Sequence, residues 1–271
     1  MKKTQQEKNK ALIPTDAIDF KGDDILKALE WGVKHNKHVL LIGETGTGKT
    51  ASIKALAQKH KRPYRRLSME SGTTSDDIIG RILLNAEGTY WIDGDLTDAL
   101  RHGHWVLIDE VNATPPEVMF KLHPLLDDDA HLILNEHDGE VIKPHPDFRL
   151  FASMNPNYAG TRTLNRAFVS RFSFVVNYQH LVEKEEVKLL IERTGIKADI
   201  ALSMVKVGND MRQRYREGTI SLPLSFRELE AWALLTEDFG YEQALALSVV
   251  NKCTQESDED RDGIFTSLNL K

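Results

Sequence analysis

The sequence predicts an α/β fold in which helices cover both faces of a parallel sheet, followed by a small all-helical domain. Five short runs have the length of buried strands, four of them apolar and one (63–69) mixed: 38–43, 63–69, 104–110, 148–155 and 172–177. Helical stretches separate these runs, and apolar strands alternating with helices are typical of a parallel sheet buried on both faces. After about residue 180 only helical stretches follow, at 183–192, 197–216, 225–236 and 241–250.

This pattern divides the chain into three segments: a flexible N-terminal segment at 1–15, an α/β core at 16–180 and a helical lid at 181–271. Two insertions interrupt the alternation of strands and helices in the core. Residues 81–94 and 131–143 are both predicted to be hairpins, and the second should turn at Asp138-Gly139.

Two helices carry predicted start signals. Thr114-Pro115-Pro116-Glu117 indicates a capping box with proline at the first helical position, and Pro124 should kink the helix that follows. Ser225 and Glu228 indicate a second capping box. The apolar face of that second helix would consist of Leu229, Trp232 and Ala233.

Composition and charge exclude several classes of protein. The chain has 271 residues, 41 % of them hydrophobic, one cysteine and a formal net charge of −6. No run of about 18 apolar residues is present, so we expect no membrane span and, together with the single cysteine, a cytoplasmic protein. The acidic balance argues against nucleic-acid binding. A basic run at 59–66 keeps that alternative open, although cations at a helix C-terminus would explain it equally.

The segment after the first strand is predicted to bind phosphate. Its eight residues fit G-x-x-x-x-G-K-[ST] at every position: Gly43, Glu44, Thr45, Gly46, Thr47, Gly48, Lys49 and Thr50. The backbone N–H groups of such a loop bind phosphate oxygens, while Lys49 would contact the β- and γ-phosphates and the Thr50 hydroxyl would bind Mg²⁺. No N-K-x-D tetrapeptide for guanine is present, so we predict ATP with Mg²⁺.

The apolar strand at 104–110 delivers two acids to its C-terminal end, where ligands of open α/β sheets bind. Asp109 is predicted to hold Mg²⁺, directly or through water. Glu110, one residue further, would polarise a water for attack on the γ-phosphate. Two groups are needed because a carboxylate that binds Mg²⁺ is a poor base.

The end of the strand at 148–155 resembles the first sensor of AAA+ ATPases, a polar side chain between the catalytic glutamate and the γ-phosphate. Here that residue is Asn155. The resemblance covers the chain from about residue 20 to 250 and implies a P-loop AAA+ core with a helical lid and ATP between them. The catalytic residues that it implies are Lys49, Glu110, Asn155, Arg171 and Arg227.

Three arginines lie in segments that resemble functional parts of these ATPases. Arg171 resembles the arginine finger that reaches ATP held by the neighbouring subunit, and Arg166 is a second candidate. Arg227, in the first turn of a lid helix, resembles the second sensor. A guanidinium in these positions would neutralise charge on the transferring phosphoryl group. Surface ion pairing is the alternative for Arg171 and Arg166, and an ordinary surface arginine is the alternative for Arg227.

The two insertions, together with the stretches 75–81 and 145–156, resemble the MoxR-type group of AAA+ ATPases, which includes CbbQ, NorQ, GvpN and CobS. This resemblance implies a homo-oligomer, typically a hexamer, that acts as a chaperone-like activator of a protein substrate. It also implies a separate partner with a von Willebrand factor A domain, because this chain has no D-x-S-x-S metal motif of its own.

The loop at 68–77 lacks the aromatic-glycine signature of pore loops, so threading of a substrate through an aromatic pore is not expected. Tyr90 and Trp91 are aromatic residues that could contact a substrate or pack against their own hairpin. A nucleic-acid motor and a nucleotide-gated scaffold with little turnover are the alternative functions.

Two apparent metal motifs are discounted. Asp258 to Gly263 resembles the start of an EF-hand loop, but position twelve would be Asn269 instead of glutamate. His102 and His104 are interpreted as structural, since no third ligand has metal-site spacing.

Overall fold

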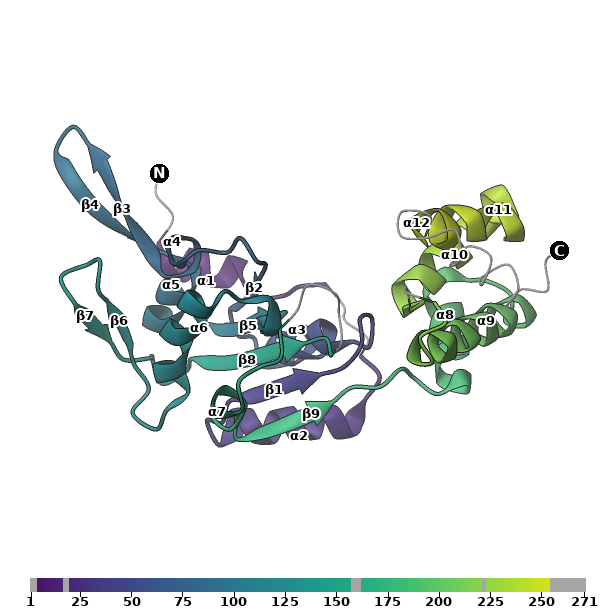
Figure 1. Cartoon of the computed structure of the whole chain (residues 1–271), viewed down its shortest axis with the longest axis horizontal. Helices are drawn as coiled ribbons and strands as arrows, with labels where there is room; N and C mark the ends of the chain where they lie inside the picture. The colour runs from purple at the N-terminus through teal and green to yellow at the C-terminus, as the bar shows by residue number, and fades with distance from the viewer. Residues whose placement is uncertain (1–3, 17–19, 157–161, 221–222, 254–271) are drawn as a thin grey trace. The chain divides into compact units, whose positions relative to one another are not determined.

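The computed structural model describes residues 4–16, 20–156, 162–220 and 223–253 (Figure 1). The chain forms two compact units, Met1–Glu44 with Gly48–Tyr178 and Gln179–Lys271 with Thr45–Thr47. The first unit contains the central sheet, and the second is helical. The division after Tyr178 lies close to the boundary expected at residue 180.

Five strands form the central sheet of the first unit: β1 (Val39–Ile42), β2 (Tyr64–Ser68), β5 (Trp105–Asp109), β8 (Arg149–Met154) and β9 (Phe174–Asn177). Their order across the sheet is β2-β5-β8-β1-β9, and every pairing is parallel. This confirms the predicted fold class. Because all strands run the same way, their carboxyl ends meet at one edge of the sheet.

Both faces of the sheet are buried, because successive residues of a strand point to opposite sides. Leu40 and Val106 enter one apolar core, whereas Leu41 and Leu107 enter the other. The helices that cover the first core are α5 (Asp95–His102) and α6 (Pro116–Leu122), and those that cover the second are α2 (Asp23–Lys34) and α3 (Lys49–Lys59). Shorter elements of this unit are α4 (Ser75–Ile78), α7 (Arg166–Val169), and the 3₁₀ turns η1 (Val111–Ala113) and η2 (His123–Leu126).

The start of α6 shows that the predicted capping box is wrong. The helix begins at Pro116 with Pro115 at the N-cap and no side-chain cap hydrogen bond. Its third position is therefore Val118, one residue beyond the glutamate that a capping box needs. The Thr114 hydroxyl is buried and has no hydrogen-bond partner among the described residues. At the other end, the α-helix stops before Pro124, and the chain continues as η2.

The N-terminal segment is more ordered than its polar composition predicted. α1 (Gln5–Ala11) begins with a capping box between Thr4 and Glu7. The Leu12 carbonyl oxygen accepts a hydrogen bond from the Tyr64 N–H of β2 at 3.0 Å. A polar composition indicates only that most side chains of the segment face water. A capping box and one backbone hydrogen bond to β2 can still order such a segment.

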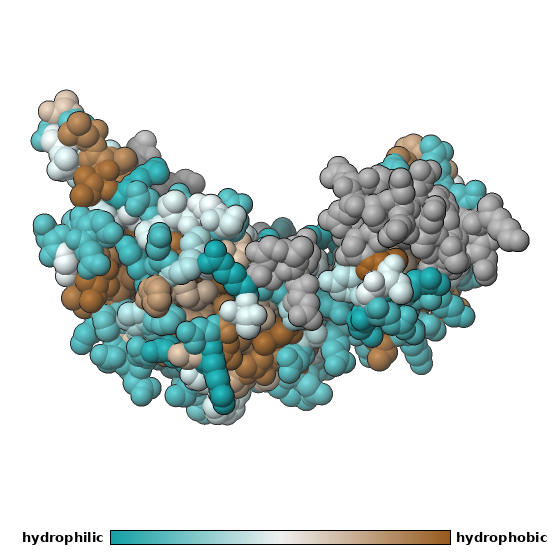
Figure 2. Space-filling view, in the orientation of Figure 1, coloured by the Kyte–Doolittle hydropathy of each residue, from teal (hydrophilic) through white to brown (hydrophobic). Residues whose placement is uncertain are grey.

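Two antiparallel hairpins extend from the first unit (Figure 1). β3 (Gly80–Asn85) pairs with β4 (Gly88–Asp93), and β6 (Leu132–Leu134) pairs with β7 (Glu140–Ile142). The second turns at Asp138 and Gly139, whose φ angles of 52° and 67° suit an Asp-Gly turn. Apolar surface lies over both hairpins (Figure 2). The exposed large apolar side chains of the hairpin strands are Ile82, Leu84, Tyr90, Ile92, Ile133 and Val141.

The second unit consists of α8 (Glu183–Thr194), α9 (Ala198–Arg216), α10 (Phe226–Phe239), α11 (Tyr241–Leu245), the π-helical turn η3 (Ala246–Val250) and α12 (Asn251–Cys253). These helices share an apolar core of their own. α10 begins with the predicted Ser225–Glu228 capping box and buries Leu229, Trp232 and Ala233, as expected. No helix among the described residues is long and apolar enough to cross a bilayer. The segment that resembles an EF-hand lies outside the described residues.

Candidate nucleotide site

Three predicted motifs follow three neighbouring strands of the sheet. The phosphate loop follows β1, Asp109 is the last residue of β5, and Asn155 comes directly after β8. Since β8 lies between β1 and β5, Asn155 lies between the loop and the acid pair. The sequence could predict each motif, but the order of the strands is what brings them together.

The loop has the backbone conformation that its glycines allow. Gly46 and Gly48 have φ angles of 80° and 91°, in the left-handed region where a side chain would be strained. Gly48 is the N-cap of α3, so the free N–H groups of the first helical turn begin at Lys49. A helix N-terminus after a glycine-rich loop favours anionic phosphate.

Lys49 is buried and held by acceptors of the loop and of Asn155, the residue that follows β8. Its Nζ donates to the carbonyl oxygens of Gly43 (2.7 Å) and Glu44 (2.8 Å) and to Asn155 Oδ1 (2.6 Å). Burial lowers the pKa of Lys49 to about 8, against the opposing attraction of the Asp109, Glu110 and Glu44 carboxylates. A bound phosphate would offset this loss of hydration with a full negative charge.

Asp109 is surrounded by donors on three sides. Ser153 on β8 donates to Oδ1. Thr50 donates to Oδ2 at 3.2 Å, and Arg66 on β2 donates to the same oxygen at 2.7 Å. Burial acts to raise the pKa of Asp109, but the hydrogen bond from Ser153 and the Arg66 charge outweigh it, so the pKa lies below its ordinary value. The carboxylate is thus kept ionised.

Thr50 and Asp109 fit a magnesium ion by their chemistry. Hydroxyl and carboxylate oxygens are hard ligands, and Mg²⁺ takes one or two protein ligands besides phosphates and waters. Among the described residues, no three His, Cys, Asp or Glu side chains gather as a metal site of another kind.

Glu110 lies next to Asn155. Asn155 Nδ2 donates to Glu110 Oε1 at 3.4 Å, while Asn155 Oδ1 accepts from Lys49. The Glu110 backbone is left-handed, with φ 57° and ψ 43°. Such a conformation is uncommon for a residue with a side chain and is often found at functional sites. One amide therefore links the cationic end of the site to the carboxylate end.

Sequence reasoning missed three residues of this cluster: Arg66, Asn112 and Ser153. Buried Asn112 donates from Nδ2 to the Asn155 carbonyl oxygen at 3.0 Å. The signal for Ser153 was its place two residues before Asn155 on an otherwise apolar strand. Asn112 had no such signal, because its role depends on the turn that follows Glu110.

Arg171, the predicted arginine finger, makes its hydrogen bonds away from this cluster within the first unit. Arg171 Nε donates to Asp127 Oδ1 at 2.7 Å, and a terminal nitrogen donates to the Ala167 carbonyl oxygen. Arg166, in the first turn of α7, is exposed. Arg227, in the first turn of α10, is also exposed. Within one chain, Arg171 therefore forms an ion pair, which is the alternative to the role of an arginine finger.

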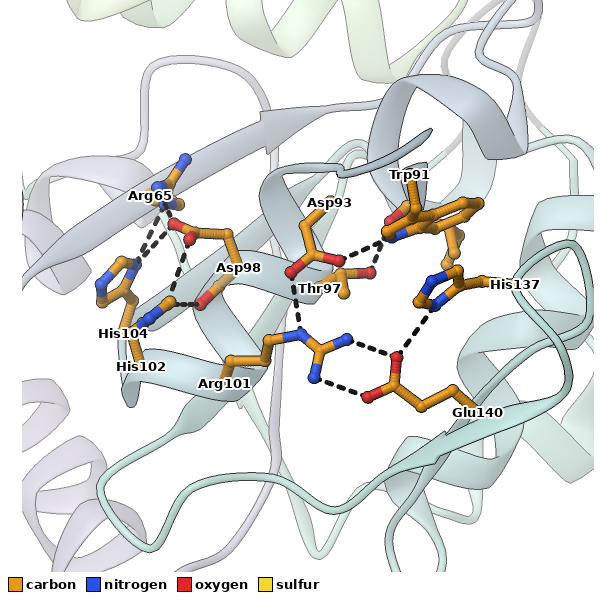
Figure 3. Close-up of polar contacts among 11 residues, drawn as sticks. Arg65, Trp91, Asp93, Thr97, Asp98, Arg101, His102, His104, His137 and Glu140 are labelled. Atoms are coloured by element: carbon orange, nitrogen blue, oxygen red, sulfur yellow. Dashed lines mark hydrogen bonds and ion pairs between the residues drawn. The ribbon is translucent and has the colours of Figure 1, made fainter. Parts of the chain in front are cut away.

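Four of the five Lys and Arg side chains in the basic run at 59–66 form ion pairs. Lys59 pairs with Glu30, and Arg62 pairs with Asp147 at 2.8 Å. Arg65 pairs with Asp98 of α5 (Figure 3) and with Asp95 of the same helix, and Arg66 pairs with Asp109. These cations are neutralised by the protein itself, which removes the main support for a nucleic-acid surface.

Figure 3 also shows how α5 fastens the two hairpins. Arg101 donates to Asp93 at the base of β4 (2.8 Å) and makes two 2.7 Å bonds to Glu140 on β7. Trp91 stacks on His137 of the second hairpin, with ring centroids 5.1 Å apart. The structure thus places Trp91 in a packing role, whereas Tyr90 is exposed.

His104 is a buried structural histidine, as predicted. Its Nδ1 accepts from Arg65 Nε at 3.0 Å, so the ring proton lies on Nε2, which is 2.9 Å from Asn9 Oδ1 on α1. Burial and the neighbouring Arg65 lower its pKa to about 4. Protonation of Nδ1 would break the bond to Arg65.

We therefore expect stability to fall as the pH drops from about 6.5 to 4. The unfolded histidine takes up a proton near pH 6.5, whereas the folded one resists protonation until about pH 4, so acid favours the unfolded chain by up to about 3 kcal/mol. Urea unfolding at several pH values would measure this. His104→Gln should flatten the dependence and the exposed His35→Gln should not. Equal slopes for wild type and His104→Gln would contradict the assignment.

The fold and the motifs at its sheet edge define a P-loop protein with the AAA+ architecture. Two family profiles match the chain: the AAA domain (dynein-related subfamily) at residues 38–172 and the CbbQ/NirQ/NorQ C-terminal domain at residues 186–264. With the relatives described next, they show that the chain belongs to the MoxR-type AAA+ ATPases of the CbbQ, NorQ and CobS group.

The aerobic cobaltochelatase subunit CobS of Sinorhizobium sp. is 30 % identical over 267 residues, which cover 92 % of this chain and 80 % of CobS. The denitrification regulatory protein NirQ of Pseudomonas aeruginosa is 31 % identical over 189 residues, 69 % of this chain and 72 % of NirQ. Midasin of Dictyostelium discoideum is 32 % identical over 73 % of this chain, which spans 4 % of midasin.

Solved structures share the fold at low identity. A RuvB variant from Thermotoga maritima has a TM-score of 0.54 and 18 % identity, over 93 % of this chain and 72 % of RuvB. A protein from Cytophaga hutchinsonii has a TM-score of 0.52 and 16 % identity, over 92 % of this chain and 89 % of the other. These likenesses support the architecture alone.

Proposed function

We propose that this chain binds ATP with Mg²⁺ and hydrolyses it as one subunit of a homo-oligomeric ring, typically a hexamer, and that turnover remodels or activates a protein partner. The observation that carries the proposal is the series of contacts from Lys49 through Asn155 to Glu110, beside the Thr50–Asp109 pair. These contacts gather one ammonium, one amide, one hydroxyl and two carboxylates at one sheet edge, which supports the proposed roles.

The proposed roles follow from these contacts. The N–H groups of Gly43–Thr50 and the Lys49 ammonium would hold the phosphates. Thr50 and Asp109 would hold Mg²⁺, which when bound supplies charge neutralisation at the phosphate oxygens. Glu110 would accept a proton from water, and Asn155 Nδ2 would orient that water or the carboxylate itself. Arg227 is proposed as the second sensor from the resemblance of its segment.

We propose Arg171 as the residue that completes the site of a neighbouring subunit. Within one chain its guanidinium is held by Asp127, and its side chain is 31 % exposed. A partly exposed ion pair contributes little stability, so it can be exchanged for a phosphate contact. The fixed bond to the Ala167 carbonyl would orient the planar guanidinium.

The test is specific ATPase activity at increasing protein concentration for wild type, Arg171→Ala and Arg166→Ala. Turnover per subunit should rise with concentration as rings form. Arg171→Ala should lower kcat by about 10³-fold or more while still binding ATP, because a finger acts in the transition state. Asp127→Asn removes only the tether and serves as the control that should remain active.

Three outcomes separate the alternatives. Flat turnover with an active Arg171→Ala variant would show that the finger assignment is wrong. Loss of activity only in Arg166→Ala would move the role to that residue. Concentration-dependent assembly on ATP without product from wild type would indicate a nucleotide-gated scaffold.

A protein partner is favoured over nucleic acid by the surface. The paired basic run leaves little free positive charge, whereas the hairpins expose apolar side chains such as Leu84, which is 78 % exposed, and Val141, which is 57 % exposed. Exposed apolar patches mark protein contacts. A separate protein with a von Willebrand factor A domain is the partner that we propose from the family resemblance.

A further inference from the structure

Arg66 forms an ion pair with the Asp109 carboxylate, which is a proposed ligand of Mg²⁺. Two of its guanidinium nitrogens lie 2.7 and 2.6 Å from Asp109 Oδ2, the oxygen that also accepts from Thr50. The other oxygen accepts from Ser153. Protein donors therefore hold both oxygens of Asp109, and a positive charge already neutralises it.

The strand pattern explains why Arg66 is there. β2 is the edge strand next to β5, and Arg66 stands opposite Leu107 in the register, two residues before the end of each strand. Neighbouring side chains of a strand point to opposite sides. Arg65 accordingly reaches Asp95 and Asp98 on α5, while Arg66 reaches Asp109.

The two partners differ in their freedom to move. The Arg66 side chain is 49 % exposed, whereas that of Asp109 is 8 % exposed. Asp109 is held by the strand and by Ser153, so it stays in place when its partner leaves. Arg66 can turn into water, where a guanidinium loses little.

A guanidinium and a divalent cation cannot share the same carboxylate lone pairs, and their charges repel at this distance. We propose that Arg66 is a built-in counter-cation that holds the Asp109 carboxylate in the nucleotide-free protein, is displaced when Mg²⁺ binds, and so raises the Mg²⁺ concentration that the site requires. This inference rests on the proposed binding of ATP with Mg²⁺. Arg66 acts here as a positioning residue.

The experiment is a calorimetric titration of Mg²⁺ into the protein saturated with AMPPNP, an ATP analogue that is not hydrolysed. Arg66→Gln should lower the half-saturating Mg²⁺ concentration about fivefold, because the metal no longer competes with a partly exposed ion pair. Arg66→Lys, which keeps the charge without the two-nitrogen contact, should shift it in the same direction by less. The exposed Arg81→Gln on β3 makes the same change of charge away from the site and should match wild type.

A structural role for Arg66 would not make Mg²⁺ bind more tightly, and a role in phosphate binding would weaken AMPPNP binding in EDTA. An unchanged or higher half-saturating Mg²⁺ concentration in both folded Arg66 variants would overturn the inference. If wild type shows no Mg²⁺-dependent binding of AMPPNP, the proposed function itself fails. The two failures are therefore distinguishable.

Discussion

Replacing Glu110 with glutamine should lower ATP turnover by about 10²–10⁴-fold and leave the affinity for ATP within a few-fold of wild type. Glutamine has the shape of glutamate and can still meet Asn155, whose Nδ2 lies 3.4 Å from Glu110 Oε1. It cannot accept a proton from water at neutral pH. Lys49, the proposed phosphate-binding cation, donates its hydrogen bonds to Gly43, Glu44 and Asn155, so these bonds stay intact.

Steady-state release of phosphate and calorimetric binding of ATP would measure the two quantities on the same preparation. Glu117→Gln is the matched control, since Glu117 is an exposed carboxylate on α6, seven residues further along the chain. It should keep wild-type turnover. If Glu110→Gln hydrolyses ATP at the wild-type rate, another group is the base and the proposed role of Glu110 is wrong.

The architecture was predictable because its signals are local. Each strand of the sheet is a short run between helical stretches, and continuous apolar strands such as Val39–Ile42 indicate burial on both faces. The order β2-β5-β8-β1-β9 was not predictable by the same means, because no local pattern states which strands are neighbours. The run of helical stretches after about residue 180 predicted the second, helical domain, and the family resemblance implied that this domain is a lid.

The candidate site also contains residues that local sequence patterns predict and residues that they do not. Gly43–Thr50, Asp109 and Glu110 could be identified from motif spacing, whereas Arg66 looked like one cation of a basic run. Its contact with Asp109 depends on the pairing of β2 with β5, which places residues 43 positions apart on one edge. The Thr114 capping signal failed because a shift of one residue moves the glutamate out of the third helical position.

A buried charged pair in the second unit could not be predicted from the sequence either, because its two residues lie on different helices. Its loss gives the largest change in stability that we expect. Arg212 on α9 and Glu186 on α8 are 0 % and 1 % exposed and form two hydrogen bonds of 2.7 Å. Arg212 Nε also donates to the Leu224 carbonyl oxygen at 2.7 Å. The guanidinium thus joins two helices and the segment before α10.

Arg212→Ala should lower the free energy of unfolding of the helical unit by about 3–5 kcal/mol, because it leaves the Glu186 carboxylate buried without its partner. Arg214→Ala is the control on the same helix: its pair with Asp210 is partly exposed, so it should cost less than about 1 kcal/mol. Denaturant unfolding followed by far-ultraviolet circular dichroism, with the fluorescence of buried Trp232 as a second probe, would measure both.

Apolar side chains in place of Arg212 and Glu186 could make this core as stable as the buried ion pair does. Removing both charges with Arg212→Met and Glu186→Leu should recover much of the loss, since apolar side chains of similar volume avoid the desolvation of two ions. If the double variant is as unstable as Arg212→Ala, the hydrogen bond to Leu224 is what matters, because that carbonyl loses its donor in both variants. If Arg212→Ala alone unfolds like wild type, water reaches Glu186, and the pair is not closed from solvent as the structure has it.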